Sequence, residues 1–341
     1  MMNTSVVIPN WNGKDSLQAC IDSLLKQSLK SNIIVVENGS TDGSLEFLQN
    51  KYPDIQLVIN KKNLGFAGGV NSGIRASIER SDDFVALFNN DATADKDWLK
   101  NLVDKMNSSP KIGIAAPKIL TSDGKHMDST GDMYSNWGLA YPRGRGEQTS
   151  DKYDDSTDIF AASGGASIYR IKMLEQIGLF DEDFFAYYED VDISFRAQLA
   201  GWKIAYVPTS IVYHEIGGTS KTVSGFTTYQ TIKNVPWLAI KNVPSRYLFG
   251  VMFRLRIAQL LFFFRAISRG NGLAATKGTW VGVIKTPKKL VQRHRIQKNK
   301  KVSNEYIWNM MTHDLPANSS ALRSVRAKWW KLTRRSHVDS D

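Results

Sequence analysis

Short apolar runs alternate with stretches of helical spacing through the first third of the chain. In the helical stretches, apolar residues recur every three or four positions, as they do at Leu17, Ile21 and Leu24. We expect strands at residues 5–9, 33–36, 56–59 and 84–88, and helices at 15–27, 44–51, 69–80 and 97–106. Strands that alternate with helices of this length predict βαβ units and a mainly parallel sheet flanked by helices, the α/β class.

Beyond residue 110 the alternation is less regular. We expect strands at residues 112–117, 166–169, 204–208 and 211–213, with a helix at 191–200. The stretch 121–158 is polar, with Gly, Pro, Ser and Asp alongside Trp137 and Tyr141. We therefore expect it to be a surface insertion near the functional site.

The strand expected at residues 84–88 stops abruptly at Asn89-Asn90-Asp91. A carboxylate directly after a buried parallel strand lies in the crevice where open α/β sheets bind ligands. Asp91 would there hold a hard divalent cation, and the cation would hold a diphosphate. The same three residues also fit simple turn chemistry, or a cap by Asp91 on the helix that follows.

Other polar, glycine-containing motifs also follow expected strands: SVVIPNWNG at 5–13, VVENGSTDGS at 35–44 and NLGFAGGVNSG at 63–73. Together with Asn89-Asn90-Asp91 they resemble the family 2 glycosyltransferases of the GT-A fold, particularly the rhamnosyltransferase-like subgroup. Further matching motifs extend the resemblance to about residues 3–220, namely GGA at 164–166, FDEDFF at 180–185, YEDVD at 188–192 and HEIGGTS at 214–220.

The resemblance implies a pocket for a nucleotide-diphosphate sugar. Glu37 stands where the family usually has Asp and would accept a hydrogen bond from the pyrimidine ring NH. Asp42 fits a tight turn near the base and ribose, and equally a plain Asx-turn. The Gly-rich loop allows close backbone approach to a nucleotide. The expected nucleotide-sugar-binding set is Pro9, Asn10, Glu37, Asn38, Asp42, Asn63, Gly65, Phe66, Gly68, Asn71, Asn89 and Asn90.

The resemblance also implies a metal and a general base. Asp91 matches the last position of the family's Asp-x-Asp motif, with Asn89 at the first, and Mg²⁺ or Mn²⁺ suits oxygen ligands. His214 would ligate this metal or contact the diphosphate, although it also fits a structural role. Asp190 matches the family's general base, with Glu189 as the alternative. The simpler interpretation of both acids is a favourable helix N-terminus.

The aromatic residues near these motifs have two possible roles. They could line a platform for a sugar ring, or they could belong to the core, as most buried aromatic side chains do. The residues concerned are Trp137, Tyr141, Phe185, Tyr187, Tyr188 and Trp202.

Net charge divides the chain into two parts. Residues 1–232 carry 22 basic and 29 acidic side chains, a net charge of −7, whereas residues 233–341 carry 22 and 4, a net charge of +18. We expect 1–232 to be the GT-A catalytic domain and 233–341 to be a helical, basic C-terminal extension. Such asymmetry indicates an anionic partner for the basic part. No nucleic-acid-binding module is apparent, so anionic lipid is the expected partner rather than nucleic acid.

The extension contains a helix expected at residues 246–269 with arginines on one arc and Phe and Leu opposite. Its longest uncharged run, 257–264, is shorter than the ~20 apolar residues of a spanning helix. An interfacial helix would have this pattern, with Phe249, Phe253 and residues 262–264 towards lipid. The alternative is a helix that packs on the catalytic domain with its arginines in solvent. Basic clusters at 285–301 and 323–335 follow, the second around Trp329 and Trp330, which suit a headgroup region.

Two further features concern location. Cys20 is the single cysteine, which rules out an intramolecular disulfide and is compatible with a reducing compartment. The N-terminus has no cationic segment followed by an apolar one, so we expect no cleaved signal peptide. The expected location is cytoplasmic, peripheral on the inner face of the cell membrane.

The sequence thus predicts an inverting, metal-dependent glycosyltransferase of cell-surface polysaccharide synthesis. Its donor would be dTDP-rhamnose or, second, a UDP-sugar, and its acceptor a glycan or lipid-linked glycan. One rival is a sugar nucleotidyltransferase, although residues 5–13 contain one glycine where a triphosphate-binding loop needs several. The other is a non-catalytic, membrane-associated nucleotide-sugar-binding protein. A dinucleotide-dependent oxidoreductase is disfavoured, since neither phosphate-binding glycine motif follows a strand.

Overall fold

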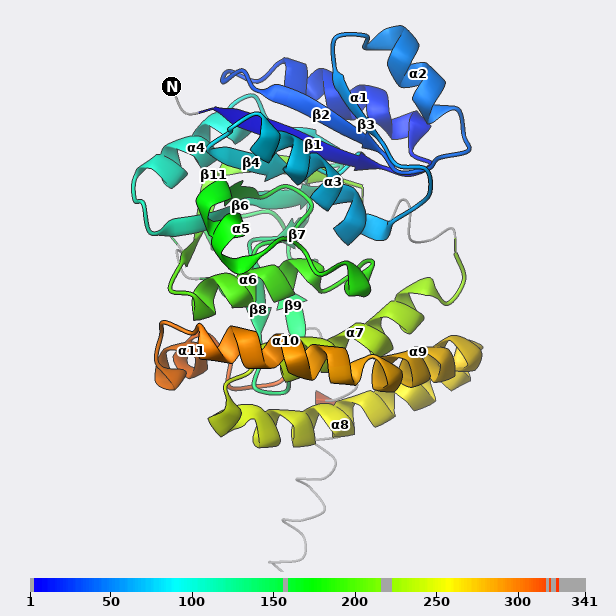
Figure 1. The fold of residues 1–341 in the computed structure, drawn as a ribbon, viewed down its shortest axis with the longest axis vertical. Coiled ribbons are helices and arrows are strands. Elements are labelled where there is room, and N and C mark those ends of the chain that lie inside the picture. The colour runs from blue at the N-terminus through cyan, green and yellow to red at the C-terminus, as the bar shows by residue number, and fades with distance from the viewer. Residues whose placement is uncertain (1–2, 156–158, 216–222, 317–318, 320–322, 325–341) are drawn as a thin grey trace, which may run out of the picture.

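The computed structural model describes residues 3–155, 159–215, 223–316, 319 and 323–324. Within these residues the main sheet has nine strands, ordered β3-β2-β1-β4-β10-β6-β11-β5, with β7 added beside β6 (Figure 1). The strands are β1 Thr4–Asn10, β2 Asn32–Glu37, β3 Gln56–Ile59, β4 Phe84–Leu87, β5 Ala92–Ala94, β6 Ile112–Thr121, β7 Met127–Ser129, β10 Ile168–Arg170 and β11 Lys203–His214. A separate pair joins β8 (Asp132–Tyr134) to β9 (Ala140–Pro142).

Strands β3, β2, β1 and β4 are parallel to one another, and so are β6 and β11. Strand β10 lies antiparallel between β4 and β6, and β5 lies antiparallel to β11 at the edge. The carboxyl ends of β1, β2 and β4 therefore meet at one edge of the sheet, which is where such folds bind ligands.

Helices cover both faces of this sheet and extend below it. In the sheet-containing part they are α1 Lys14–Leu25, α2 Ser44–Lys51, α3 Gly65–Glu79, α4 Trp98–Asn107, α5 Ile171–Ile177, the 3₁₀ turn η1 Glu182–Phe184 and α6 Glu189–Leu199. The C-terminal part consists of α7 Phe226–Asn242, α8 Ser245–Ser268, α9 Gly272–Ile284, α10 Thr286–Lys298 and α11 Asn304–Met310.

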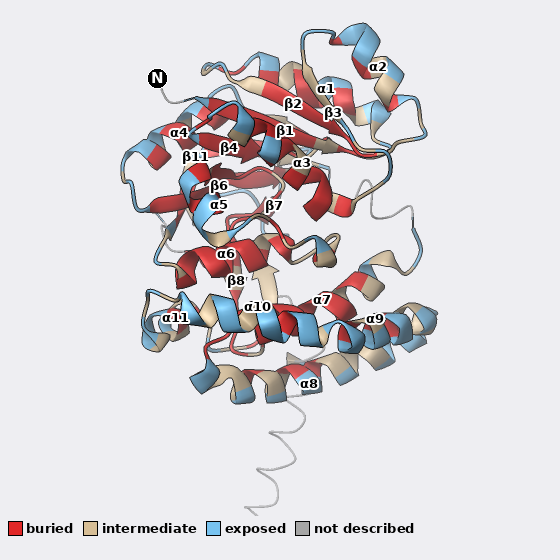
Figure 2. Cartoon of the chain, in the orientation of Figure 1, coloured by how far each residue is buried: buried red, intermediate tan, exposed pale blue. Residues whose placement is uncertain are grey.

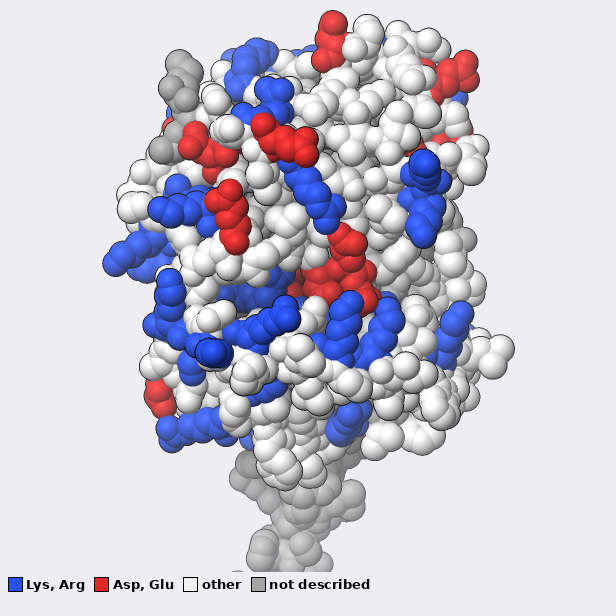
Figure 3. All heavy atoms as spheres, viewed as in Figure 1, with Lys and Arg blue, Asp and Glu red and all other residues white. Residues whose placement is uncertain are grey.

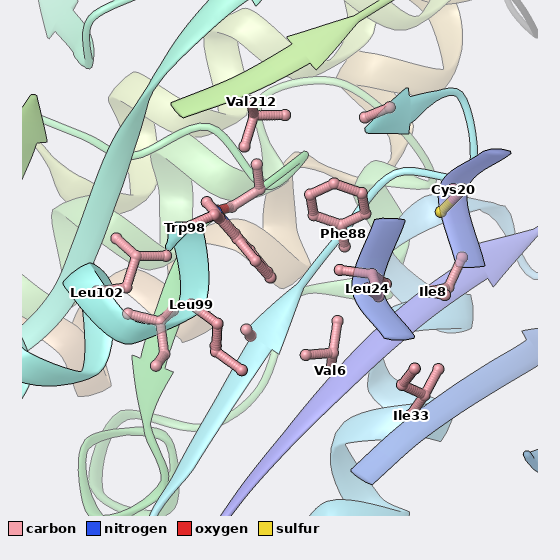
Figure 4. Close-up of a cluster of buried hydrophobic side chains, with 14 of the residues drawn as sticks. Val6, Ile8, Cys20, Leu24, Ile33, Phe88, Trp98, Leu99, Leu102 and Val212 are labelled. Carbon is pink, nitrogen blue, oxygen red and sulfur yellow. The ribbon is translucent and has the colours of Figure 1, made fainter. Parts of the chain in front are cut away.

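Each face of the sheet has its own hydrophobic cluster. The central strands are buried on both faces, and their sequences are therefore continuous apolar runs. On one face, side chains of α1 and α4 pack over β1 and β4, and the Phe88 and Trp98 rings meet edge to face at 4.7 Å (Figure 4). On the other face, α3, α5 and α6 pack against the same strands, with Tyr169 at the centre. Cys20 is buried in the first cluster, as expected for a small apolar side chain.

The elements expected from the sequence are confirmed as helices or strands, with three main differences. Helix α3 begins at Gly65, four residues before the expected start. Strand β11 is continuous through two segments expected as separate strands, with a register shift between Val207 and Ile211. Strand β5 was not expected, because its three residues, Ala92–Ala94, are too few to show a period.

The expectation that residues 121–158 form a surface insertion is wrong for the first half of that stretch. Met127 and Tyr134 are fully buried, as are the polar residues Asp128 and Ser135. The polar side chains are tolerated inside because they are paired, for example Ser129 Oγ with Asp132 Oδ1 at 3.1 Å. A polar composition therefore indicated buried hydrogen bonding here and not exposure.

The C-terminal helices share a core with the sheet-containing part. Helix α7 runs without a break across residue 232. Its Trp237 and Leu238 join a third hydrophobic cluster with Tyr134, Phe160 and Phe195, so the two parts are packed together. Residues 325–335, most of the third basic cluster, lie outside the described residues together with Trp329 and Trp330.

Helix α8 combines both arrangements that the sequence left open. Val251, Leu255 and Ala258 pack inward, whereas Phe249, Phe253 and other large apolar residues face outward (Figure 2). Helix α8 has 24 residues, and an 18-residue window within it has a mean hydropathy of 1.5, so it is long and apolar enough to cross a membrane, a property that the uncharged-run count missed. Of its most apolar window, 17% is buried.

Candidate active site

A cavity of about 650 Å³ lies at the carboxyl ends of β1 and β4 and reaches the N-terminus of α6. Twelve residues predicted from the sequence line it, namely Pro9, Asn10, Asn38, Asn63, Gly65, Phe66, Asn89, Asn90, Asp91, Glu189, Asp190 and His214. The structure therefore brings the expected nucleotide, metal and acid residues to one place. Trp11, Ser129, Asp132 and Arg145 also line it and were not predicted.

Four predicted binding residues lie outside the lining of this cavity. Glu37 is buried below the floor, where its two oxygens accept hydrogen bonds from Asn10 Nδ2 at 2.9 Å and Ser40 N at 2.6 Å. Asp42 forms the simple Asx-turn, accepting from Ser44 N at 3.0 Å. The Asn71 side-chain amide donates to Phe180 O and accepts from Phe180 N, and Gly68 packs against Leu64.

A chain of amide side chains connects this floor to the turn after β4. Asn90 Nδ2 donates to Asn10 Oδ1 at 2.7 Å, and Asn10 in turn donates to Glu37. A Cβ at Gly13 would lie 2.0 Å from Asn90 Nδ2, so only glycine permits this approach. The Asn-Asn part of the motif thus fixes the loop after β1 beneath the cavity.

Asn38 holds the Gly-rich loop in place. Its Nδ2 donates to Gly65 O at 3.0 Å, and its Oδ1 accepts from Leu64 N at 3.1 Å. Gly65 itself has φ +73°, a left-handed conformation that favours glycine. Both contacts bring the N-terminus of α3 to the cavity, where backbone NH groups attract anions.

Asp91 and His214 meet because β5 pairs with β11. The register places His214 opposite Ala92, next to Asp91, and His214 Nε2 lies 3.2 Å from Asp91 Oδ1. Asp91 Oδ1 is buried and accepts no hydrogen bond from any described residue. Such an oxygen beside a histidine nitrogen fits a cation, because burying an unsatisfied carboxylate oxygen is otherwise costly.

Two residues on neighbouring elements orient His214. Asp128 Oδ2 lies 2.9 Å from His214 Nδ1, and Arg145 Nη2 lies 2.8 Å from Asp128 Oδ1. Burial opposes protonation of His214, but the hydrogen bond to Asp128 and the negative charges of Asp91 and Asp128 outweigh it and raise the pKa of His214 to about 9. Among the described residues, no group of three or more His, Cys, Asp and Glu side chains is arranged to hold a metal. Asp91 and His214 would therefore supply the protein ligands, and diphosphate oxygens the rest.

Three carboxyl groups also line this cavity. Asp190 Oδ2 accepts from Gly164 N at 3.0 Å and Oδ1 from Val191 N at 2.8 Å, at the N-terminus of α6. Burial raises the pKa of Asp190 despite these hydrogen bonds. Burial, and then the charge of Asp190, raise the pKa of Glu189 and bring that of Asp132 to about 7. The site thus places three carboxyl groups with raised pKa values in the same cavity as Asp91.

The candidate platform aromatics divide between the cavity and the core. Tyr141, Phe185, Tyr187 and Tyr188 line the cavity, together with Phe226 from the start of α7, which was not predicted. Trp137 packs into the third cluster and Trp202 into the second.

Solved structures with the same arrangement share the GT-A fold of glycosyltransferases. One is GalNAc-T7 with UDP, GalNAc and Mn²⁺, at a TM-score of 0.57, 18% identity and coverage of 72% of this chain and 49% of that one. Another is the mannosyltransferase PcManGT from Pyrobaculum calidifontis with GDP-Man and Mn²⁺. Its TM-score is 0.53 at 14% sequence identity, and the match covers 87% of this chain and 86% of that one.

The sequence model of glycosyl transferase family 2 matches residues 5–178, so this chain belongs to that family. A curated relative is the N-acetylglucosaminyl-diphospho-decaprenol L-rhamnosyltransferase of Mycobacterium tuberculosis, 29% identical over 53% of this chain and 66% of that protein. Another is the low-salt glycan biosynthesis hexosyltransferase Agl10 of Haloferax volcanii, which is 26% identical over 57% of this chain and 61% of that protein. This chain thus matches less than two thirds of either relative's own length.

Proposed function

We propose that the protein is an inverting glycosyltransferase that moves a sugar from a nucleotide diphosphate to a glycan or lipid-linked acceptor. The observation that carries this proposal is that two groups of residues meet in one cavity. Asp91 Oδ1 and His214 Nε2 lie 3.2 Å apart there, and the Asp190 carboxyl group lines the same cavity. Inverting transfer needs both groups, because a cation can stabilise the leaving diphosphate while a carboxylate takes the proton of the incoming hydroxyl.

On the donor side, Asn38, Asn63 and the N-terminus of α3 would receive the nucleotide. Asp91 and His214 would hold Mg²⁺ or Mn²⁺, which when bound would neutralise the charge that develops on the leaving diphosphate. Asn89 stands beside them, with Nδ2 3.3 Å from His214 Nε2.

On the acceptor side, Asp190 would act as the general base. The acceptor oxygen attacks the anomeric carbon while the bond from that carbon to the diphosphate oxygen breaks, and the diphosphate leaves with the electron pair. Asp190 takes the hydroxyl proton as the new bond forms. The hydrogen bonds from Gly164 N and Val191 N fix the direction of its carboxylate.

For the substrates, dTDP-rhamnose is our first candidate donor and a UDP-sugar the second. The mycobacterial relative supports rhamnose, since its name describes rhamnosyl transfer to a diphospho-decaprenol-linked sugar. We propose a lipid-linked acceptor of the same kind for this chain.

A lipid-linked acceptor would require contact with a membrane, and the C-terminal helices offer a surface for it. Large apolar side chains point outward from α8, α9 and α10, namely Phe249, Phe253, Leu260, Phe264, Ile267, Leu273, Trp280, Val283, Ile284, Leu290 and Val291. Phe262 and Phe263 differ from the expectation, since they pack against the core. We propose that this outward surface, the apolar face, binds the inner leaflet of the cell membrane peripherally.

A thermal-shift screen of the full-length protein against nucleotide sugars, with and without Mn²⁺, tests the proposal. We expect dTDP-rhamnose or a UDP-sugar to raise the melting temperature only when Mn²⁺ or Mg²⁺ is present, and EDTA to abolish the shift. Stabilisation by a nucleoside triphosphate with a sugar phosphate would instead favour a nucleotidyltransferase. Binding without any transfer to a lipid-linked acceptor would favour the non-catalytic alternative.

A further inference from the structure

The loop between η1 and α6 has an unusual backbone. Phe185, Tyr187 and Tyr188 have φ values of 66°, 68° and 72°, in the left-handed region that bulky residues rarely occupy. Such conformations cost free energy and persist only where surrounding structure holds them. This loop, the aromatic loop of residues 185–188, directly precedes Glu189 and Asp190 and contributes all four of its residues to the cavity lining.

Side chains of helix α7 donate hydrogen bonds to the backbone of this loop. Asn234 is fully buried, and its Nδ2 lies 3.0, 2.9 and 2.8 Å from the carbonyl oxygens of Phe184, Ala186 and Tyr187. Lys233 Nζ adds a contact with Phe184 O at 3.3 Å. One side-chain amide thus contacts three carbonyl oxygens within residues 184–187, none of which belongs to its own helix.

The Gly-rich loop supports the aromatic loop from the donor side. Ala67 N donates to Phe185 O at 3.1 Å. A Cβ at Gly65 would lie only 2.4 Å from the same oxygen, so the two loops can approach this closely only because residue 65 is glycine. The aromatic loop is therefore held between the expected nucleotide-binding loop and α7.

The loop and α7 together form an aromatic wall beside Asp190. The Phe226 ring lies 6.1 Å from that of Phe185 and 6.0 Å from that of Tyr187, centroid to centroid. Aromatic side chains bind the apolar face of a sugar ring, while hydroxyls such as that of Tyr187 remain able to hydrogen-bond. This wall adjoins Asp190 along the chain, because the aromatic loop directly precedes Glu189 and Asp190.

We propose that Phe185, Tyr187 and Phe226 form the subsite for the acceptor's saccharide unit, and that Asn234 is the positioning residue that keeps this subsite assembled. The inference rests on the proposed function, because it assigns the wall to the acceptor of that reaction. It gives α7 a role in substrate recognition.

Hydrogen–deuterium exchange of the peptide covering residues 184–190 tests the positioning role without any substrate. We expect Asn234→Ala to speed exchange there by at least tenfold, because three carbonyls lose their donor. Leu238→Ala is the matched control, since Leu238 is equally buried on α7 but packs into the third cluster. Equal exchange in the two variants, or no change in Asn234→Ala, would overturn the positioning role.

Kinetics test the subsite, with dTDP-rhamnose as donor and N-acetylglucosaminyl-diphospho-decaprenol as acceptor. For Phe226→Ala and Asn234→Ala we expect the acceptor KM to rise about tenfold, while the Kd for dTDP stays within twofold of wild type. An unchanged acceptor KM, or a matching loss of dTDP affinity, would overturn the subsite. If wild type binds neither dTDP nor UDP, the proposed function fails, whereas the exchange experiment still decides the role of Asn234.

Discussion

At the scale of single residues, Asp128 links the expected metal site to the rest of the protein. It accepts from His214 through one oxygen and meets Arg145 through the other. Carboxylates in this position fix the tautomer and direction of a metal-binding histidine. We expect Asp128→Asn to weaken Mn²⁺ binding by about 10–100-fold, the usual effect of losing such a partner. Titration of the nucleotide-bound protein with Mn²⁺, followed by electron paramagnetic resonance, measures it.

Asp123→Asn is the control for that experiment, because Asp123 lies in the turn before β7, is exposed and bonds only to its own turn. Mn²⁺ affinity should be unchanged in this variant. If both variants bind Mn²⁺ as wild type does, then His214 needs no orienting carboxylate, or it is not a ligand.

The general-base role of Asp190 predicts a selective loss. Asp190→Asn should keep nucleotide affinity while transfer falls by roughly two to four orders of magnitude, the usual contribution of a general base. The amide keeps the shape and can still accept from Gly164 N, so the fold should survive. Single-turnover transfer measured next to Glu189→Gln separates the two acids, and near wild-type transfer in Asp190→Asn would move the role to Glu189.

Residues that adjoin long strands and helices were predictable from the sequence, and residues in the short strands and turns of 121–158 were not. Asp91 and Asp190 reach the cavity because one follows a strand and the other opens a helix. Asp128, Asp132 and Arg145 were missed because residues 121–158 show no period that assigns a face. Even with hindsight, only the density of Asp in that buried segment would have marked them.

At the scale of elements, buried ion pairs join the C-terminal helices to η1 and to helix α6. Lys289 of α10 is fully buried and lies 2.7 Å from Asp181 Oδ2 and 2.8 Å from Asp183 Oδ2. Lys241 of α7 bridges Asp181 and Asp192, at 2.6 and 2.8 Å. Figure 3 shows acidic side chains next to basic ones on the surface just above the position of α10 in Figure 1. Part of the positive charge of the C-terminal helices is therefore used in ion pairs inside the protein.

Removing one of these lysines should destabilise the protein strongly. We expect Lys289→Met to lower the free energy of unfolding by about 3–5 kcal/mol, the usual result of leaving buried carboxylates without a partner. Lys288→Met is the matched control, because Lys288 bonds the same Asp183 but is exposed, and such pairs contribute ~1 kcal/mol or less. Urea unfolding measures both, and equal losses would contradict a buried network.

The same network predicts acid sensitivity. Burial opposes ionisation of Asp181 and Asp183, but the surrounding lysines outweigh it and hold the pKa of both carboxyls well below the usual value. Their stabilising contribution is therefore complete above the unfolded pKa of about 3.9. It is lost as pH falls through the lower folded pKa. Melting temperatures between pH 7 and pH 2 should drop more steeply for wild type than for Lys289→Met.

At the scale of the whole molecule, the apolar face predicts how the protein meets lipid. Sedimentation with anionic vesicles should weaken as salt rises without vanishing, because salt screens charge but not apolar burial. Replacing Phe249, Phe253 and Phe264 together by Ser should remove the salt-resistant part. Ile59→Ser is the control, since Ile59 is equally exposed but lies on β3, far from the face in sequence. If salt-resistant vesicle binding persists after the three Phe residues are replaced, the apolar face does not bind lipid and would instead bind another partner.

The sequence predicted one half of the fold far better than the other. Periodicity located β1 to α4 because each element there buries one face against the sheet. It gave no arrangement for α7 to α11, whose packing depends on the third cluster, built from Tyr134 and Phe195 as well as Trp237. A charge boundary at residue 232 likewise cuts α7, because charge follows surface and ion pairing while a helix follows its hydrogen bonds.

The burial of Cys20 has a practical consequence for labelling chemistry. Its Sγ lies inside the core, 3.4 Å from Asn89 O, and burial raises the pKa of the thiol far above neutrality. Thiolates and not thiols attack maleimides, so the one native cysteine should stay unmodified in the folded protein. A fluorophore can then be attached at Phe264→Cys on an otherwise native chain. Its emission would report directly whether that side of α8 enters lipid.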